Sequence, residues 1–200
     1  MSWVRKTGVS LVAGGAMLCV SAVGTVAYGR VMARLDVARF RAQGGAAALW
    51  DAKRIQAYEK TLHVKFAPPL AVLRVPALGI EAPLLEGTSD VAMNRGVGHI
   101  EGSALPGEVG NIAIAGHRDG FFRALKDVKV GEVVELERQT SAGMKRDLYQ
   151  VERIAVVDPA DVSVVAPTND AMLTLVTCYP FYFVGTAPQR FVVQAKLIRE

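Results

Sequence analysis

The feature that most restricts the possible folds is the stretch from residue 70 onward, where short apolar runs alternate with turn residues. The runs are separated by Gly, Pro, Asn and Asp and lie at 70–75, 80–85, 111–116, 133–137, 148–154, 172–177 and 191–198. Short runs of this kind, bounded by turn residues, are typical of β-strands. We therefore predict an all-β barrel or sandwich, with helices confined to short pieces around 121–125 and 158–162.

The N-terminal part of the chain has a different character. Residues 7–29 carry no charged side chain, and an uncharged run of this length can cross a hydrocarbon core of about 30 Å as a helix. Arg5 and Lys6 precede the run, and Arg30 and Arg34 follow it, so the positive charges alone give no clear orientation. A cleaved signal peptide is the alternative, but the run is longer than the usual apolar region of such a peptide, and we favour a retained anchor.

Between these two parts, residues 31–63 carry apolar side chains at helical spacing with charges between them. Gly44 and Gly45 interrupt the pattern, which indicates two helices with a hinge. Pro68 and Pro69 mark its end. We therefore divide the chain into a membrane anchor at 1–29, a helical stalk at 30–69 and a β-domain at 70–200.

Charge and cysteine content exclude two functional classes. The net charge is +4, but the basic residues form no stripe with stacking aromatics, so we expect no nucleic-acid partner. We assign the excess positive charge to the neighbourhood of anionic lipid. The two cysteines, Cys19 and Cys178, lie in different parts of the chain and form no CxxC pair, which argues against a disulfide framework and a thioredoxin-type reaction.

Cys178 is the first candidate for chemistry. It closes the apolar run 173–177, and Tyr179-Pro180 follows at once, so its side chain is expected at a strand edge that can face a cleft. A buried structural cysteine is the ordinary alternative. A lone thiol in an exported domain, without a partner to pair with, is a candidate reactive group.

A histidine and an arginine lie at similar edges. His117 follows the run 112–116 and begins a turn, and histidine is a common general acid and base because its ordinary pKa lies near neutral pH. Arg190 precedes the last run, and its permanent charge suits an oxyanion. Arg118 and Arg123 are weaker rivals in the loop after the histidine. With the thiol, these groups are a minimal set for cysteine acyl transfer, although each also has a plain surface interpretation.

Further polar residues are candidates for binding substrate: Thr177, Asp119 and His99. His99 lies in the Gly-rich stretch 96–99, which we expect to be a loop, and competes with His117, but no apolar run precedes it. Asp119 either orients the histidine or caps its turn. Only His117 and Asp119 form a close pair of possible metal ligands, so we expect no metal and no cofactor.

These motifs resemble those of the sortases, cysteine transpeptidases of bacterial surfaces. The segment TLVTC at 174–178 resembles their TLxTC signature, and GHRDGFFR at 116–123 resembles the histidine segment of the class D branch. CYPF at 178–181, with APQRFVV at 187–193, also resembles that branch. The resemblance covers about 70–200 and implies a closed β-barrel of about eight strands with short helices, behind an anchor and a stalk.

The resemblance also implies an activity. The family cleaves a sorting signal of the LPxTG type after its threonine, so Cys178 would be the acylated nucleophile, His117 the proton donor to the leaving amine and Arg190 the stabiliser of substrate and oxyanion. The implied partners are secreted proteins with such C-terminal signals, an amine acceptor on a cell-wall precursor or a protein, and membrane lipid around the N-terminal helix. The catalytic domain would be extracytoplasmic. The loop at 185–189 is short, which leaves the exact sorting motif open.

Two other classes of protein stay open at this point. L,D-transpeptidases also carry a histidine before a catalytic cysteine, but their cysteine usually follows a Ser-x-Gly stretch, whereas Leu-Val-Thr precedes Cys178. A non-catalytic β-barrel interaction module would leave Cys178, His117 and Arg190 without mutual proximity. Convergence of these three side chains on one cavity is therefore the structural test.

Overall fold

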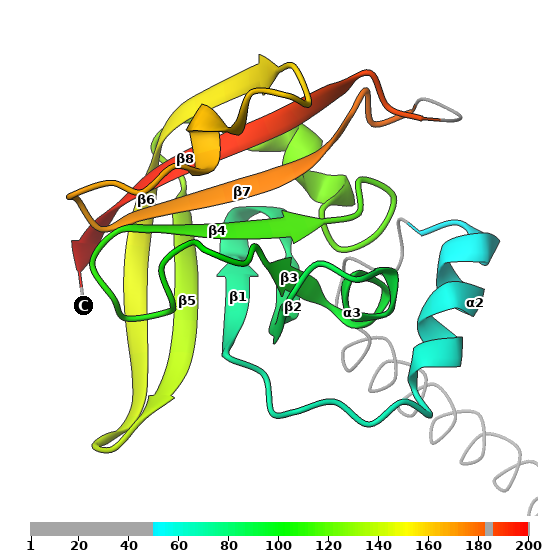
Figure 1. The fold of residues 1–200 in the computed structure, drawn as a ribbon, viewed down its shortest axis with the longest axis horizontal. Helices are drawn as coiled ribbons and strands as arrows, with labels where there is room; N and C mark the ends of the chain where they lie inside the picture. The colour runs from blue at the N-terminus through cyan, green and yellow to red at the C-terminus, as the bar shows by residue number, and fades with distance from the viewer. Residues whose placement is uncertain (1–49, 183–185, 200) are drawn as a thin grey trace, which may run out of the picture. The chain divides into compact units, whose positions relative to one another are not determined.

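The computed structural model describes residues 50–182 and 186–199 (Figure 1). Its helices are α2 (Ala52–Thr61), η2 (Pro76–Leu78), α3 (Asp90–Arg95), η3 (Arg123–Asp127) and η4 (Val162–Val165). Its strands are β1 (Ala71–Val75), β2 (Ile80–Glu86), β3 (Val97–His99), β4 (Asn111–Gly116), β5 (Val133–Thr140), β6 (Gly143–Val157), β7 (Met172–Tyr179) and β8 (Gln189–Arg199).

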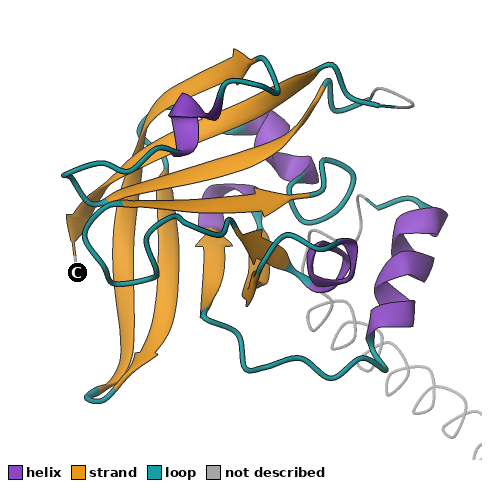
Figure 2. Cartoon of the chain, viewed as in Figure 1, coloured by secondary structure: helices purple, strands orange, loops and turns teal. Residues whose placement is uncertain are grey.

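The strands form a closed barrel in the order β1-β2-β3-β4-β7-β8-β6-β5 (Figure 2). The pairs β2–β3 and β4–β7 are parallel, and the remaining described pairs are antiparallel. The predicted all-β closed barrel of about eight strands with short helices is confirmed, and β5 and β6 form a hairpin within it.

Apolar side chains from every side of the barrel fill its interior. The largest fully buried ones include Leu73, Leu84, Ile112, Ile114, Phe122, Leu125, Leu136, Tyr149, Leu173 and Leu175. Each large apolar side chain contributes about 1.5–3 kcal/mol when it is buried rather than exposed. Strands β4 and β7 are buried along most of their length, and the side chain of Asn111 donates hydrogen bonds to the Val164 and Ala166 carbonyls beside η4. The two parallel strands therefore hold a rigid central position.

Three local predictions need correction. The segment 96–99, expected to be a loop, contains strand β3, because Gly96 and Gly98 allow the backbone to pass closely by its neighbours: a Cβ on Gly98 would lie 2.4 Å from the Gly87 carbonyl oxygen. Helix α3 was not expected, although Ser89 caps it by accepting the Ala92 N–H at 3.3 Å. The short helices expected at 121–125 and 158–162 begin later, as η3 and η4.

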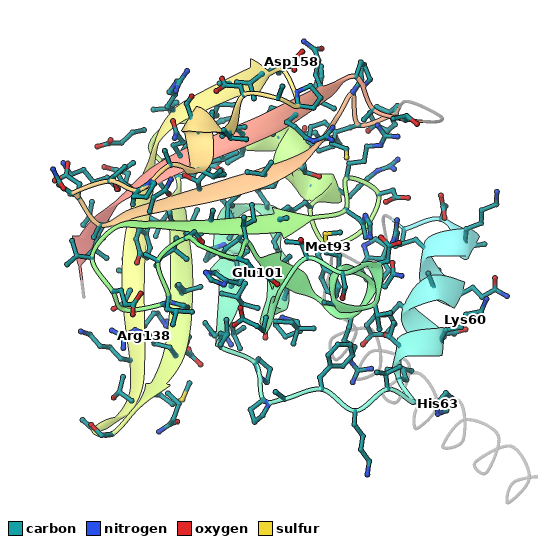
Figure 3. The ribbon with its side chains drawn as sticks, in the orientation of Figure 1. Lys60, His63, Met93, Glu101, Arg138 and Asp158 are labelled. Carbon is teal, nitrogen blue, oxygen red and sulfur yellow. The ribbon has the colours of Figure 1, made fainter. Side chains whose placement is uncertain are left out.

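Helix α2 lies in the described part of the predicted stalk, which is residues 50–69. It ends at Thr61, before the two prolines, and Asp51 caps it by accepting the Arg54 N–H at 2.8 Å. Lys60 and His63 point away from the barrel (Figure 3), and both are exposed. Among the described residues, no helix is long and apolar enough to span a membrane. The predicted anchor at 1–29 lies outside them.

Candidate active site

The register of three neighbouring strands brings the predicted catalytic residues to one end of the sheet. Cys178 on β7 lies directly opposite Arg190 on β8, so both side chains project from the same face. On the other side of β7, Gly116 at the end of β4 pairs with Thr177. His117 is the next residue after Gly116, which places it beside Cys178 in the strand order β4, β7, β8.

These residues surround a cavity of about 300 Å³. Its lining consists of Arg54, His117, Arg118, Asp119, Cys178, Thr186, Ala187 and Arg190. The three predicted catalytic side chains therefore share one cavity, together with Asp119 from the predicted binding set. The cavity also carries more positive than negative side chains, which suits a reaction that develops negative charge on an oxygen.

Close packing around Gly116 fixes the point at which the histidine leaves the sheet. A Cβ on this glycine would lie 2.6 Å from the ring of Phe122, which is fully buried, so only glycine fits. On the neighbouring strand, the hydroxyl of Thr177 donates to the Gly116 carbonyl at 2.7 Å. The turn that follows is closed by the Gly120 N–H, which donates to the His117 carbonyl at 3.0 Å. The backbone at His117 is thus held on both sides.

Burial lowers the pKa of His117 below its ordinary value, and the nearby positive charge of Arg54 lowers it further. The carboxylates of Asp119 and Asp90 act in the opposite direction with smaller effects. The imidazole is therefore mainly neutral at neutral pH. In that form it can accept a proton from a thiol.

Two arginines bind the loop that connects β7 to β8. Arg190 donates to the carbonyls of Ala187 at 3.3 Å and Gln189 at 3.1 Å. Arg118 donates to the Pro180 carbonyl at 3.1 Å. These hydrogen bonds fix both ends of the described part of this loop beside the cysteine.

Thr177 and His99, predicted to bind substrate, are not among the residues that line the cavity. The Thr177 side chain is 2% exposed, and its hydroxyl binds the β4 backbone. His99 is also 2% exposed; its ring nitrogens contact Glu86, Ser103 and the Ala104 carbonyl at 3.0–3.3 Å. Both side chains are buried and hydrogen-bonded within the barrel, so they stabilise the fold around the cavity.

Arg54 lines the cavity and was missed by the sequence analysis, which assigned it to the stalk. Its guanidinium forms an ion pair with Asp119 at 2.7 Å and also donates to the side chain of Asn94. No spacing pattern connects Arg54 to the histidine segment. The packing of α2 shows the connection.

Comparison with known proteins agrees with the fold. A family model described as the sortase domain matches residues 73–198. Sortase D of Bacillus subtilis (strain 168) is 34% identical over 128 residues, which cover 64% of this chain and 63% of that protein. This similarity supports the class D-like resemblance.

Solved structures give the same result. A sortase D5 transpeptidase of Clostridium perfringens has a TM-score of 0.58 and 28% identity, with 72% of this chain and 88% of that chain covered. A point mutant of sortase E from Streptomyces avermitilis has a TM-score of 0.55 and 31% identity, with 66% and 89% covered. The match to the family model, the similar proteins and the shared barrel together show that this chain belongs to the sortase family.

Proposed function

We propose that this chain is a membrane-anchored cysteine transpeptidase that cleaves an LPxTG-like sorting signal and transfers the acyl group to an amine. The observation that carries the proposal is the cavity shared by Cys178, His117 and Arg190 at the ends of three neighbouring strands. A nucleophile, a proton carrier and a fixed cation are the groups that acyl transfer through a thioester requires.

In the first half of the reaction, His117 takes the proton of the Cys178 thiol. The thiolate attacks the carbonyl carbon of the substrate threonine, a C–S bond forms, and the carbonyl oxygen becomes negative. Arg190 donates to that oxygen. The C–N bond then breaks, the protonated His117 gives its proton to the leaving amine, and a thioester remains on Cys178.

In the second half, an acceptor amine attacks the thioester carbonyl. His117 takes a proton from the attacking nitrogen, the C–S bond breaks, and the sulfur leaves as a thiolate that regains the proton. The lowered pKa of His117 supports this role, because a neutral imidazole is ready to accept a proton in each half. The acceptor is an amine on a cell-wall precursor or on another protein.

The proposed setting is the outer face of a membrane. Residues 1–29 would anchor the chain, with lipid around this helix, and the 70–200 domain would meet secreted proteins that carry C-terminal LPxTG-like signals. A reporter enzyme that is active only outside the cytoplasm, fused after residue 200, checks this orientation. Reporter activity is expected, and its absence in a stably expressed fusion would contradict the proposed orientation.

The test of the reaction uses a fluorogenic LPxTG peptide with and without an added amine. The wild-type chain is expected to cleave the peptide, to join its acyl part to the amine and to accumulate a covalent adduct detectable by intact-protein mass spectrometry. Cys178→Ala is expected to abolish all three with its circular dichroism unchanged, whereas Cys19→Ala keeps them. Cleavage by a folded Cys178→Ala variant would overturn the proposal. Cross-linking of muropeptides without peptide cleavage would instead indicate an L,D-transpeptidase.

A further inference from the structure

The helix before the barrel is joined to the active site by aromatic packing. Trp50 lies just before α2, and the centroid of its ring lies 4.8 Å from that of Phe121 in an edge-to-face arrangement. The ring centroid of Tyr58, on α2, lies 6.4 Å from that of Phe121. Trp50 and Tyr58 also contact each other at 5.7 Å. Phe121 belongs to the segment that follows His117, so this cluster holds α2 against the histidine turn. Such aromatic pairs each contribute about 0.5–1.5 kcal/mol beyond the area they bury.

The packing directs Arg54 into the cavity. Its side chain is 14% exposed, and its guanidinium contacts Asp119 at 2.7 Å in one direction and Asn94 of α3 in the other. A Cβ built on Gly120 would lie 3.5 Å from the Arg54 Cδ and 3.4 Å from the His117 Cβ. The arginine stem therefore runs along the histidine turn, with only a glycine between them.

We propose that Arg54 is a positioning residue of the active site, which holds the His117 turn in place through Asp119 and makes α2 part of the catalytic unit. The inference rests on the proposed function, since it assigns Arg54 a part in the same reaction. A displacement of about 1 Å in a catalytic group can cost on the order of 100-fold in rate. Holding the turn is thus a sufficient reason for a partly buried ion pair at this point.

The charges around His117 make the proposal measurable as a change in the pKa of this residue. Arg54 from α2 disfavours the imidazolium, whereas Asp119 from the histidine turn and Asp90 from α3 favour it. Arg118, Cys178 and Arg190 are the other titratable or charged groups on the cavity. Removing Arg54 raises the pKa of His117, because a cation disappears and the turn becomes more hydrated. Removing the charge of Asp119 lowers the pKa.

The experiment compares Arg54→Met, Arg54→Lys and Asp119→Asn in the full chain, with Lys53→Met as the control, since Lys53 is an exposed residue of the same helix. The pKa of His117 is read by NMR with labelled histidine, and kcat and KM are measured with the fluorogenic peptide. Arg54→Met is expected to raise the pKa and to lower kcat about 10- to 100-fold. Asp119→Asn is expected to lower the pKa. Arg54→Lys restores the pKa but only part of kcat, because an ammonium lacks the planar fork.

Several outcomes decide the question. Folding is checked by circular dichroism and urea unfolding, and Asp119→Asn keeps the test valid if Arg54→Met is too unstable to assay. An unchanged His117 pKa and kcat in a folded Arg54→Met variant would refute the proposal, and so would a rise in kcat, which would mean that Arg54 obstructs the cavity. If the wild-type chain did not turn over the peptide but the two opposite pKa shifts were seen, the proposed function would fail and the link between Arg54 and His117 would stand.

Discussion

Two regions of the molecule hold the active site by different means. On the strand side, β7 and β8 place Cys178 opposite Arg190 through backbone pairing. On the helix side, His117 lies one residue beyond β4, and side chains from α2 pack against its turn. The cysteine and the arginine are therefore held by strand register, whereas, on the proposed role of Arg54, the position of the histidine also depends on one helix. The two halves of the site are thus held by different kinds of contact.

The largest effect is expected on the strand side. Arg190→Gln removes the side chain that lies directly opposite the cysteine on β8, and we expect kcat to fall about 100- to 1,000-fold, as when an oxyanion donor is lost. Lys196→Gln is the matched control, because Lys196 lies on the same strand and only forms an exposed ion pair with Asp170 at 2.9 Å. Steady-state kinetics with the fluorogenic peptide measures both. A change confined to KM would show that Arg190 only binds substrate.

A smaller effect is expected on the helix side. Trp50→Ala removes the ring contacts with Phe121 and Tyr58, so α2 is held less firmly and we expect kcat to fall about 10-fold while the barrel stays folded. Ile55→Ala, on the same helix with a side chain that is 41% exposed, is the control. Kinetics and urea unfolding are measured together. A full loss of barrel folding in Trp50→Ala would contradict the separation of the two halves.

The smallest expected effect is on how the free energy of unfolding depends on pH. His117 has a lower pKa in the folded chain than its ordinary value of 6.5, so the unfolded chain binds more protons as the pH falls through this range. The free energy of unfolding should therefore decrease below about pH 6.5 and stop decreasing from this cause below the folded pKa. Urea unfolding of wild type and His117→Gln at several pH values isolates the contribution. An identical pH dependence in both proteins would refute it.

The sequence predicted the strand side far better than the helix side. The apolar runs in β4 and β7 are continuous because both strands are buried, and the motif around Cys178 together with Arg190 stands at the ends of such runs. Strand β3 was not predicted, because it is short and contains Gly98. This glycine allows a close approach of two backbones but adds no apolar side chain to the pattern. Periodicity reveals burial within an element, but it does not reveal which elements meet.

The contribution of Arg54 illustrates the same limit. It lies 65 residues before Asp119, in a segment whose charged helical pattern is that of a solvated stalk. Nothing local distinguishes it from Lys53 beside it. The aromatic residues at Trp50 and Tyr58 were the available signal, since large rings on a stalk need a surface to cover them. The predicted boundary at residue 70 separates α2 from the turn against which it packs.

Arg190 donates to two nearby carbonyls, one in the loop before β8 and one at the first residue of β8, and these hydrogen bonds have a consequence for selectivity. The resting guanidinium already has neutral oxygen partners, so an ordinary substrate carbonyl gains little by replacing them. An oxygen that carries a full negative charge is a much stronger hydrogen-bond acceptor and would replace these carbonyls at the guanidinium. Under the proposed function, these carbonyls would compete with a neutral substrate oxygen for the guanidinium, so that Arg190 would stabilise mainly the charged oxygen formed during the reaction.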